Sequence, residues 1–214
     1  MSSGVHPSAR VHPGAEIEPD VEVGAGTAIW ADVHVRAPSR IGAECIIGER
    51  TYIAYGVEIG DRVKLNASVY VCTAVTIESG VMVGAGTVFT NDRYPRATTP
   101  DLARLRGSGP DERTLPTRVA EGASIGAGSV IGCDLTVGRF AMVGMGSVVT
   151  RSVPDFHLVV GNPARSVGAV CRCGEPVARF AVGRPARVPS VACAACGLCY
   201  SIAAGVVTES APPA

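Results

Sequence analysis

The stretch IGAECIIGERTYIAYGVEIGDRVKLNASVYVCTAVTI, residues 41–77, decides the fold of this 214-residue chain. The same kind of side chain recurs there at every sixth position, always apolar: Ile41, Ile47, Ile53, Ile59, Leu65, Val71 and Ile77. The step runs back to Val5 and forward to Phe89, and it resumes from Val119 to Val149. A period of six matches neither an isolated helix, which repeats every 3.6 residues, nor a two-faced strand, which repeats every two.

The repeat predicts one short strand and one turn per six residues, with the apolar side chain stacked on its counterpart in the next coil. A glycine often follows directly, as at Gly42, Gly48 and Gly60, where a corner demands unusual φ values. Three faces give about 18 residues per coil, so roughly twenty repeats form between six and seven coils, about 32 Å long. We therefore expect an all-β parallel β-helix whose inner column is core and carries no chemistry.

The composition excludes several classes of protein. Hydrophobic residues make up 47% of the chain and charged residues 18%, so it is not a disordered polyelectrolyte. The net charge of +0 offers no footprint for nucleic acid. The uncharged stretch at residues 188–208 contains proline, glycine and three cysteines, so we expect no membrane span. No apolar segment opens the chain, which predicts a cytoplasmic protein.

The repeat is interrupted at residues 91–118, which hold six arginines and four acidic residues. A segment of this length without periodicity inside a solenoid is expected to be an extruded functional loop, although a merely solvated insertion is the alternative. The repeat ends after Pro154. We therefore predict a β-helix domain at residues 1–165 and a cysteine-rich, zinc-ribbon-like tail at residues 166–214.

The tail carries two cysteine pairs, Cys171/Cys173 and Cys193/Cys196, about twenty residues apart. Their spacing resembles that of a small zinc ribbon, although the first pair is C-x-C rather than C-x-x-C. Four thiolates leave no open position on the metal, so the predicted Zn²⁺ is structural. Cys199 is a fifth thiol that can compete, and a reduced, partly disordered tail is the alternative.

The [LIV]-G-x-x-x-x repeat resembles that of the hexapeptide acyltransferases. More specific segments stand in order along the chain: IWADVHV (29–35), VFTNDRYPR (88–96), LPT (115–117), EGASIGAGSVI (121–131), FAMVGMGSVVTRSVPD (140–155) and VVGNPAR (159–165). Together they resemble the bacterial N-acetyltransferases that act on nucleotide-linked 3-amino sugars, such as UDP-2-acetamido-3-amino-2,3-dideoxyglucuronate. The resemblance implies a left-handed β-helix, a homotrimer, and acetyl-CoA bound in the cleft between neighbouring chains.

The resemblance also implies roles for residues on the acceptor side. His34 matches the family histidine, and an imidazole near neutrality can accept the proton of the acceptor ammonium. The alternative is a corner histidine that only hydrogen-bonds at a subunit interface. Asn91 and Asp92 match the family TND motif and are expected to hold the acceptor, the alternative for Asp92 being an Asx-turn that starts the loop. Arg93 and Arg96 are expected to meet the diphosphate of the nucleotide.

One coil departs from the family pattern. It reads LNASVYVCTAVTI at residues 65–77, where the family has LQNNVSVYEGVTL. Ser68 thus replaces one of a pair of asparagines, and Thr73 replaces an acid that contacts the acceptor sugar, which indicates a different acceptor. The donor side keeps the family sequence. We expect it to bind the pantetheine arm at the backbone of Gly126, Ala127, Gly144 and Met145, and the phosphates at Arg151 and Arg165.

Three alternative functions differ in the residues that they require. An O-acyltransferase of the same fold depends more strongly on a base, because a hydroxyl is a weak nucleophile. A non-catalytic assembly subunit is compatible with the altered acceptor coil. A γ-class carbonic anhydrase requires three histidines at one metal, whereas His6, His12, His34 and His157 are the only histidines of the chain and two of them fall in the first coil.

Overall fold

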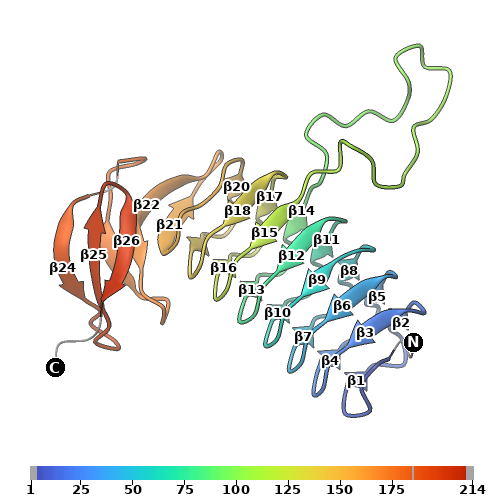
Figure 1. The fold of residues 1–214 in the computed structure, drawn as a ribbon, viewed down its shortest axis with the longest axis horizontal. Coiled ribbons are helices and arrows are strands. Elements are labelled where there is room, and N and C mark those ends of the chain that lie inside the picture. The colour runs from blue at the N-terminus through green and yellow to red at the C-terminus, as the bar shows by residue number, and fades with distance from the viewer. Residues whose placement is uncertain (1–3, 185, 211–214) are drawn as a thin grey trace.

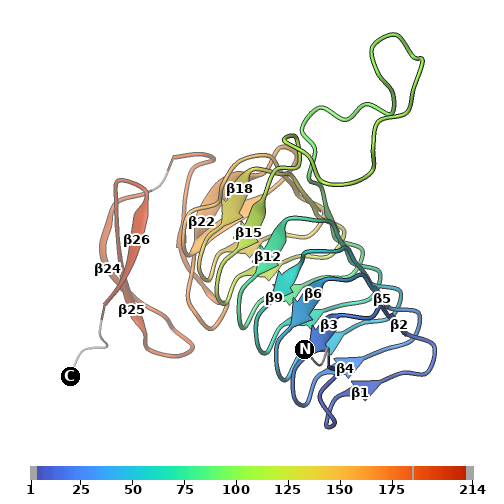
Figure 2. The same cartoon turned by 45° about the vertical axis from the view of Figure 1, so that its right-hand side comes forward.

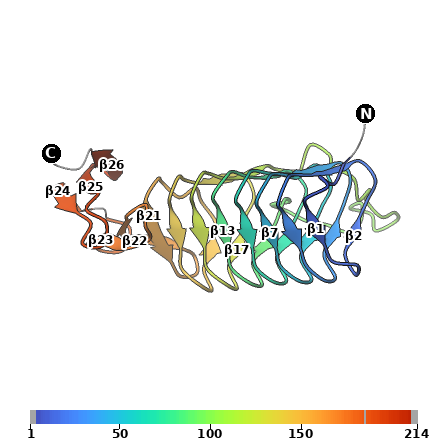
Figure 3. The ribbon, with the colours of Figure 1, turned by 90° about the horizontal axis from the view of Figure 1, so that it is seen from below.

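The computed structural model describes residues 4–184 and 186–210, and within them the chain contains strands and turns but no helix. Short strands stack into a rod with a flat-sided coil, as Figures 1 and 3 show. The described residues include no helix of the length and hydropathy that a membrane span requires. The predicted all-β parallel solenoid is therefore confirmed.

The rod has three faces, each a sheet of parallel strands. Face 1 contains β1 (Arg10–Val11), β4 (Ala28–Ile29), β7 (Ile46–Ile47), β10 (Lys64–Leu65), β13 (Met82–Val83), β16 (Ser124–Ile125), β19 (Met142–Val143) and β21 (His157–Val160). Face 2 contains β2 (Glu16–Ile17), β5 (His34–Val35), β8 (Tyr52–Ile53), β11 (Tyr70–Val71), β14 (Val88–Phe89), β17 (Val130–Ile131) and β20 (Val148–Val149). Face 3 contains β3 (Val21–Val23), β6 (Ser39–Ile41), β9 (Glu58–Ile59), β12 (Val75–Ile77), β15 (Thr117–Val119) and β18 (Leu135–Val137).

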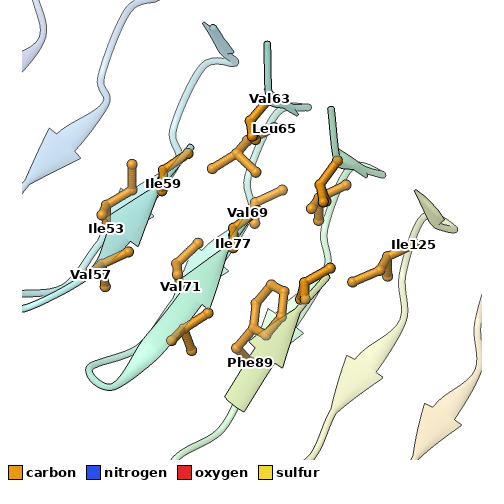
Figure 4. Close-up of a cluster of buried hydrophobic side chains, with 14 of the residues drawn as sticks. Ile53, Val57, Ile59, Val63, Leu65, Val69, Val71, Ile77, Phe89 and Ile125 are labelled. Atoms are coloured by element: carbon orange, nitrogen blue, oxygen red, sulfur yellow. The ribbon is translucent and has the colours of Figure 1, made fainter. Parts of the chain in front are cut away.

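The predicted inner column forms the core of the rod. Ile47, Ile53, Leu65 and Val83 are fully buried, and Figure 4 shows side chains of successive coils meeting inside the solenoid. Burial of each such side chain stabilises the fold by about 1.5–3 kcal/mol. Small hydroxyl residues also line the inside of the corners, where they satisfy backbone carbonyls: the Ser129 hydroxyl donates to the Gly126 carbonyl at 2.7 Å.

The rod has more coils than the predicted six to seven. Face 1 stacks eight parallel strands, and the bridges Val5↔Val23 and Val137↔Val153 extend face 3 at both ends. The apolar step of six misses the last coil because Val153 pairs with Val137 sixteen positions earlier, whereas earlier coils pair at eighteen. The final corner is therefore two residues shorter than the others.

The loop between β14 and β15 is inserted without disturbing the register. Phe89 pairs with Ile131, which is 42 positions later instead of the usual 18. Since β15 begins at Thr117, the connection comprises residues 90–116, slightly less than the predicted 91–118. The Leu115 N–H donates to the Asn91 carbonyl at 2.8 Å and closes the base of the loop. The loop projects from the rod in Figures 1 and 2.

The tail is folded and packs on the last coil. It contains β22 (Arg165–Val170), β23 (Pro176–Arg179), β24 (Val188–Ala192), β25 (Cys199–Ala203) and β26 (Val206–Ser210). β22 continues face 1 by pairing antiparallel with β21. A second core joins rod and tail, where Phe156 lies edge-on to Tyr200 at 5.5 Å between ring centroids. Covering the end of a solenoid in this way removes an edge that would otherwise be open to association.

Candidate functional site

The corner between faces 1 and 2, called here the donor corner, unites five of the predicted residues. It consists of residues 30–32, 48–50, 66–68, 84–86, 126–128 and 144–146, one set per coil. It therefore places Ser68 along the same corner as Gly126, Ala127, Gly144 and Met145. Ser68, which was predicted to bind the acceptor, lies two coils before Gly126 and Ala127.

Close stacking of the coils requires glycine in the later part of the donor corner. A Cβ on Gly126 would lie 2.4 Å from the Met145 backbone nitrogen, and one on Gly84 would lie 2.4 Å from that of Ala127. Backbone is therefore the surface that this corner presents. The N–H groups of Ala127 and Met145 donate no hydrogen bond within the described chain, and both residues are exposed. Such amides suit a ligand that carries its own carbonyls.

Arg165 lies next to the last coil of the donor corner, whereas Arg151 lies at a different corner of the rod. Arg165 begins β22 and pairs with Val160, whose Cγ1 is 2.7 Å from where a Cβ on Gly144 would lie. Its Nη1 donates to the Ala164 carbonyl at 2.8 Å, and the side chain remains partly exposed. Arg151 follows β20 on the opposite edge of face 2 and is exposed. The two predicted phosphate ligands therefore flank face 2.

The corner between faces 2 and 3, called here the loop corner, collects the predicted acceptor residues. Successive coils place Tyr55, Thr73, Asn91, Cys133 and Arg151 in one column. Thr73 and Asn91 are thus neighbours, about 4.8 Å apart along the rod.

The three charged residues at the start of the loop are engaged locally. Asp92 Oδ1 accepts from the Tyr94 N–H at 2.8 Å, which is the Asx-turn named above as the alternative. Arg93 Nη2 pairs with Asp134 at 2.7 Å, both half-exposed. Arg96 Nη1 donates to the Pro95 carbonyl at 2.9 Å. Exposed pairs of this kind contribute little stability, so a ligand can displace them.

His34 lies on face 2, in β5, within a polar and aromatic cluster. Its Nε2 is 3.3 Å from Glu18 Oε1, and its Nδ1 is 3.9 Å from Glu16. The ring lies edge-on to Tyr52 at 5.4 Å between centroids. Tyr52 in turn stacks on Tyr70 at 5.3 Å. The imidazole therefore faces outward and is held by a carboxylate.

Sequence reasoning missed Glu18, Arg36 and the two tyrosines. Glu18 accepts from the Ala37 N–H at 2.9 Å, and this bond, together with those from His34 and Arg36, lowers the pKa of its carboxyl. Arg36 pairs with Glu18 and donates to the Tyr52 hydroxyl at 3.2 Å. The hydrogen bond to Tyr52 and the pair with Glu18 raise the pKa of the guanidinium. The six-residue period could have indicated this cluster, because residues 16, 34, 52 and 70 are 18 positions apart and therefore stack on successive coils.

The structure does not bring His34 together with Asn91 and Asp92 in one chain. β5 and β14 are separated by β8 and β11 on face 2, so three strand spacings, about 14 Å, lie between them. The loop reduces this gap. The Tyr55 hydroxyl donates to the Ser108 carbonyl at 2.9 Å, and Tyr55 lies only one coil from Ala37. The loop thus returns from the coil of Asn91 toward the coil of His34.

The four predicted cysteines of the tail meet at one point. The sulfur atoms of Cys171, Cys173, Cys193 and Cys196 all lie within 4.8 Å of one another. The Cys193 sulfur accepts from the N–H groups of Cys196 and Ala195, which lowers its pKa to about 7. Tetrahedral Zn–S bonds of about 2.3 Å place sulfur atoms about 3.8 Å apart, so the cluster fits the ion. Cys199 is outside the cluster, where its thiol donates to the Gly197 carbonyl at 3.5 Å.

Comparisons with known proteins agree with this architecture. Residues 38–74 match the family model of the hexapeptide repeat of succinyl-transferase. The chain is 45% identical over 93 residues to dTDP-3-amino-3,6-dideoxy-alpha-D-galactopyranose 3-N-acetyltransferase of Aneurinibacillus thermoaerophilus, covering 44% of each chain. It is 31% identical over 115 residues to serine acetyltransferase of Haemophilus influenzae, covering 54% of this chain and 40% of the relative. The chain therefore spans less than half the length of these curated relatives.

Solved structures with a similar fold include acetyltransferases. The acetyltransferase domain of PglB from Neisseria gonorrhoeae, in complex with acetyl coenzyme A, has a TM-score of 0.49 and 21% identity, covering 74% of this chain and 57% of that one. A mutant of AntD, an N-acyltransferase from Bacillus cereus in complex with dTDP and coenzyme A, has a TM-score of 0.46 and 22% identity, covering 77% and 84%. The family-model match and the 45% identity described above confirm the expected resemblance of this chain to the hexapeptide-repeat acyltransferases.

Proposed function

We propose that the protein is an acetyl-CoA-dependent N-acyltransferase that acts on the amino group of a nucleotide-linked amino sugar. The observation that carries the proposal is the donor corner, where bare backbone at Gly126 and Gly144 leads to Arg165. The similarity to a dTDP-3-amino sugar N-acetyltransferase supports the acceptor class. Acetyl-CoA is a co-substrate here, its amide-rich arm lying along the corner and its phosphates meeting Arg165.

The reaction joins the acceptor nitrogen to the thioester carbonyl carbon and breaks the C–S bond. The nitrogen loses a proton and the leaving thiolate gains one. Holding both reactants together contributes about 7–11 kcal/mol, and an oxyanion donor accelerates the reaction about 10²–10³-fold. An unpaired N–H such as that of Ala127 is a candidate donor. A neutral amine is already a good nucleophile, so the proton acceptor supplies the smaller share.

His34 is our candidate for that proton acceptor. Its Nε2 is engaged by Glu18 at 3.3 Å, so the proton acceptor would be Nδ1, which lies 3.9 Å from the exposed Glu16 carboxylate. The loop, held by Tyr55, encloses the acceptor from the loop corner, and Asn91, Asp92 and Thr73 line its base. Arg93 and Arg96 reach the diphosphate after releasing Asp134 and the Pro95 carbonyl.

A homotrimer completes this site. The donor corner and the loop corner are opposite edges of face 2, so one chain cannot place both on the same ligand. The outward column of face 2 is also apolar over much of its length, with Tyr70, Val88 and Val130 each more than a third exposed. The outward column of face 3 is polar, with Glu22, Arg40, Glu58, Thr76 and Arg118 in register. A second chain against face 2 would cover the apolar column and bring a donor corner to a loop corner.

The cysteine cluster of the tail is proposed to hold one structural Zn²⁺. Four thiols fill the coordination sphere, so the ion would supply folding energy to the tail and no chemistry to the reaction. The proposed zinc site needs reduced thiols and the proposed reaction needs acetyl-CoA. Both requirements favour a cytoplasmic location for the protein. Elemental analysis of protein purified without chelator is expected to find one zinc per chain, and its absence would contradict this assignment.

The function is tested by turnover. Purified protein is incubated with acetyl-CoA and dTDP- or UDP-linked 3-amino sugars, and released thiol is measured. We expect turnover that depends on the acceptor, and a roughly tenfold higher KM for acetyl-CoA in Arg165→Ala with little change in acceptor KM. Arg40→Ala, which alters an exposed arginine of face 3, is the control. If the protein forms a trimer that shows no turnover and binds no acetyl-CoA, the alternative of a non-catalytic assembly subunit is supported.

One observation favours O-acylation as the second candidate. His34 and Glu18 form a pair that can activate a hydroxyl, and serine acetyltransferase is among the similar proteins. An O-acyltransferase requires this base, so His34→Ala would abolish turnover of a hydroxyl acceptor. We expect His34→Ala to retain measurable turnover of an amine acceptor at high pH, where the amine is neutral without help.

A further inference from the structure

A cavity of about 300 Å³ lies beside the single tryptophan of the chain. It is lined by Arg10, Val11, His12, Ala28, Ile29 and Trp30. Trp30 is 50% exposed, although an indole normally buries most of its surface. The volume matches the lower end of small-molecule pockets, roughly 300–1,000 Å³. It is too small for acetyl-CoA and suits one planar ring with part of its sugar.

The hollow exists because of one small residue. The outward column of face 1 runs from Arg10 through Ala28 to Ile46 and Lys64. Ala28 is the smallest of these, so its coil leaves a gap between the side chains of its neighbours. Ala28, Ile29 and Trp30 line the gap. An aromatic ring can therefore stack in it without leaving polar groups unsatisfied.

Polar groups frame the opening of this cavity. Arg10 makes no ion pair with a described residue, so its guanidinium is available to an anion. The Gly14 N–H donates to His12 Nδ1 at 3.0 Å, which leaves Nε2–H of the neutral ring as a free donor. A flat apolar slot beside a free guanidinium and an N–H donor matches a nucleobase joined to phosphate.

The donor corner itself separates this cavity from the acetyl-CoA groove. Its first position is Trp30, Gly48, Asn66, Gly84, Gly126 and Gly144 in successive coils, so the Asn66 side chain stands between the Trp30 cavity and the coils that have only glycine there. Four strand spacings, about 19 Å, separate Trp30 from Gly126. Arg165 would hold the nucleotide end of acetyl-CoA at the opposite end of the rod. The cavity is therefore free for the nucleotide of the acceptor.

We infer that the Trp30 cavity binds the nucleobase of the nucleotide-linked acceptor, with Arg10 joining Arg93 and Arg96 of a neighbouring chain in the proposed trimer at its phosphates. This inference rests on the proposed function and adds the location of the nucleotide. Trp30 and His34 belong to the same coil, so their Cα atoms are at most about 14 Å apart. A nucleotide seated at Trp30 holds its sugar toward face 2 and the His34 imidazole.

The test uses Trp30 as its own probe, because no other tryptophan contributes fluorescence. dTDP, UDP, ADP and coenzyme A are titrated separately into the full-length protein. We expect saturable quenching by dTDP or UDP and none by coenzyme A at the concentration that saturates the donor site. Quenching by coenzyme A or ADP alone would assign the cavity to the donor and overturn the inference.

Three variants separate this site from the rest of the reaction. Ala28→Ile fills the hollow with the residue that Ile46 already supplies in the next coil, so the fold tolerates it. We expect it to weaken dTDP or UDP binding about tenfold or more and to raise the acceptor KM likewise. Arg10→Ala should weaken the binding of dTDP or UDP more than the binding of the free nucleoside. Lys64→Ala, in the same column, should change neither affinity.

The outcomes distinguish this inference from the proposed function. Turnover of a nucleotide-linked amino sugar with an unchanged acceptor KM in Ala28→Ile would refute the cavity and leave the acyltransferase intact. Quenching by dTDP or UDP that Ala28→Ile abolishes, in a protein without acyl transfer, would support the cavity and refute the proposed reaction. Isothermal titration of Ala28→Ile with coenzyme A, expected to match the parent protein, confirms that the donor corner is unaffected.

Discussion

The solenoid and the tail are stabilised in different ways. In the solenoid, each coil buries Val and Ile side chains against two neighbours, so the core is continuous and many residues contribute to it. The tail shares with the last coil a small core of eight buried residues, two of which belong to the cysteine cluster. Below about 70–80 residues a single hydrophobic core rarely supplies enough stability, and a metal or disulfides commonly add to it. A substitution in the core of the rod should therefore have a local effect, whereas a substitution in the cysteine cluster should affect the whole tail.

The largest effect is expected at the cysteine cluster. Cys193→Ser removes one proposed zinc ligand, and structural zinc contributes about 10–16 kcal/mol in zinc-finger peptides. We expect loss of bound zinc and rapid proteolysis within residues 171–210, while the rod stays resistant. Cys199→Ser, outside the cluster, should keep both zinc and protection. A protected tail in Cys193→Ser would show that packing on the last coil suffices.

Truncation of the rod core is the next largest effect. Leu65 is fully buried, and Leu65→Ala should lower the free energy of unfolding by about 2–5 kcal/mol. Lys64→Ala, one residue earlier and facing outward, should change it by less than about 0.5 kcal/mol. Urea denaturation measures both. If both variants lost equal stability, the inner column would not be the main source of cohesion.

A smaller effect is expected where coils approach most closely. Gly126→Ala places a Cβ against the Met145 backbone, and overpacking of this kind costs about 1–3 kcal/mol. It should also weaken acetyl-CoA binding, because it covers exposed backbone. Gly107→Ala, in the loop with open space around it, is the matched control. Thermal unfolding measures the stability of the two variants, and calorimetric titration measures their affinity for coenzyme A. Equal stability and equal affinity in both variants would contradict the close packing and the ligand-binding role of the donor corner.

The smallest effect concerns pH at the junction of rod and tail. His157 is buried, with Nδ1 2.8 Å from the Ser166 hydroxyl and Nε2 3.0 Å from the Gly205 carbonyl. Burial lowers its pKa below the ordinary 6.5. As the pH falls through about 6.5, the unfolded chain takes up this proton first, so stability decreases below that pH and is unaffected above it.

The pH dependence is checked by urea unfolding at pH 7.5 and 5.5. His157→Gln should reduce the loss of stability on acidification, because the group that titrates is gone. His12→Gln, at an exposed histidine of the first coil, should leave the loss unchanged. An identical loss in His157→Gln and the parent protein would assign the effect to other groups.

The candidate site was only partly predictable from the sequence. The six-residue spacing placed Gly126 and Gly144 at a corner, where the coils approach so closely that glycine is required. The sequence also grouped the four cysteines that the structure brings together. It offered the Asx-turn at Asp92 only as the alternative to an acceptor-binding role, and it did not indicate that Glu18 holds His34. The Glu18–His34 contact joins residues of different coils, so it depends on register and on side-chain direction.

The sequence alone determined the solenoid, the position of its interruption and the presence of a tail. A six-residue period acts locally and repeatedly, so each hexad specifies the same strand and corner regardless of the rest of the chain. Only the tertiary structure decided which side chains share an edge of the rod. It placed His34 about three strands from Asn91, returned the loop to Tyr55 and opened the hollow at Trp30. Those facts depend on stacking coils 18 residues apart, which brings distant residues together only after the whole rod has formed.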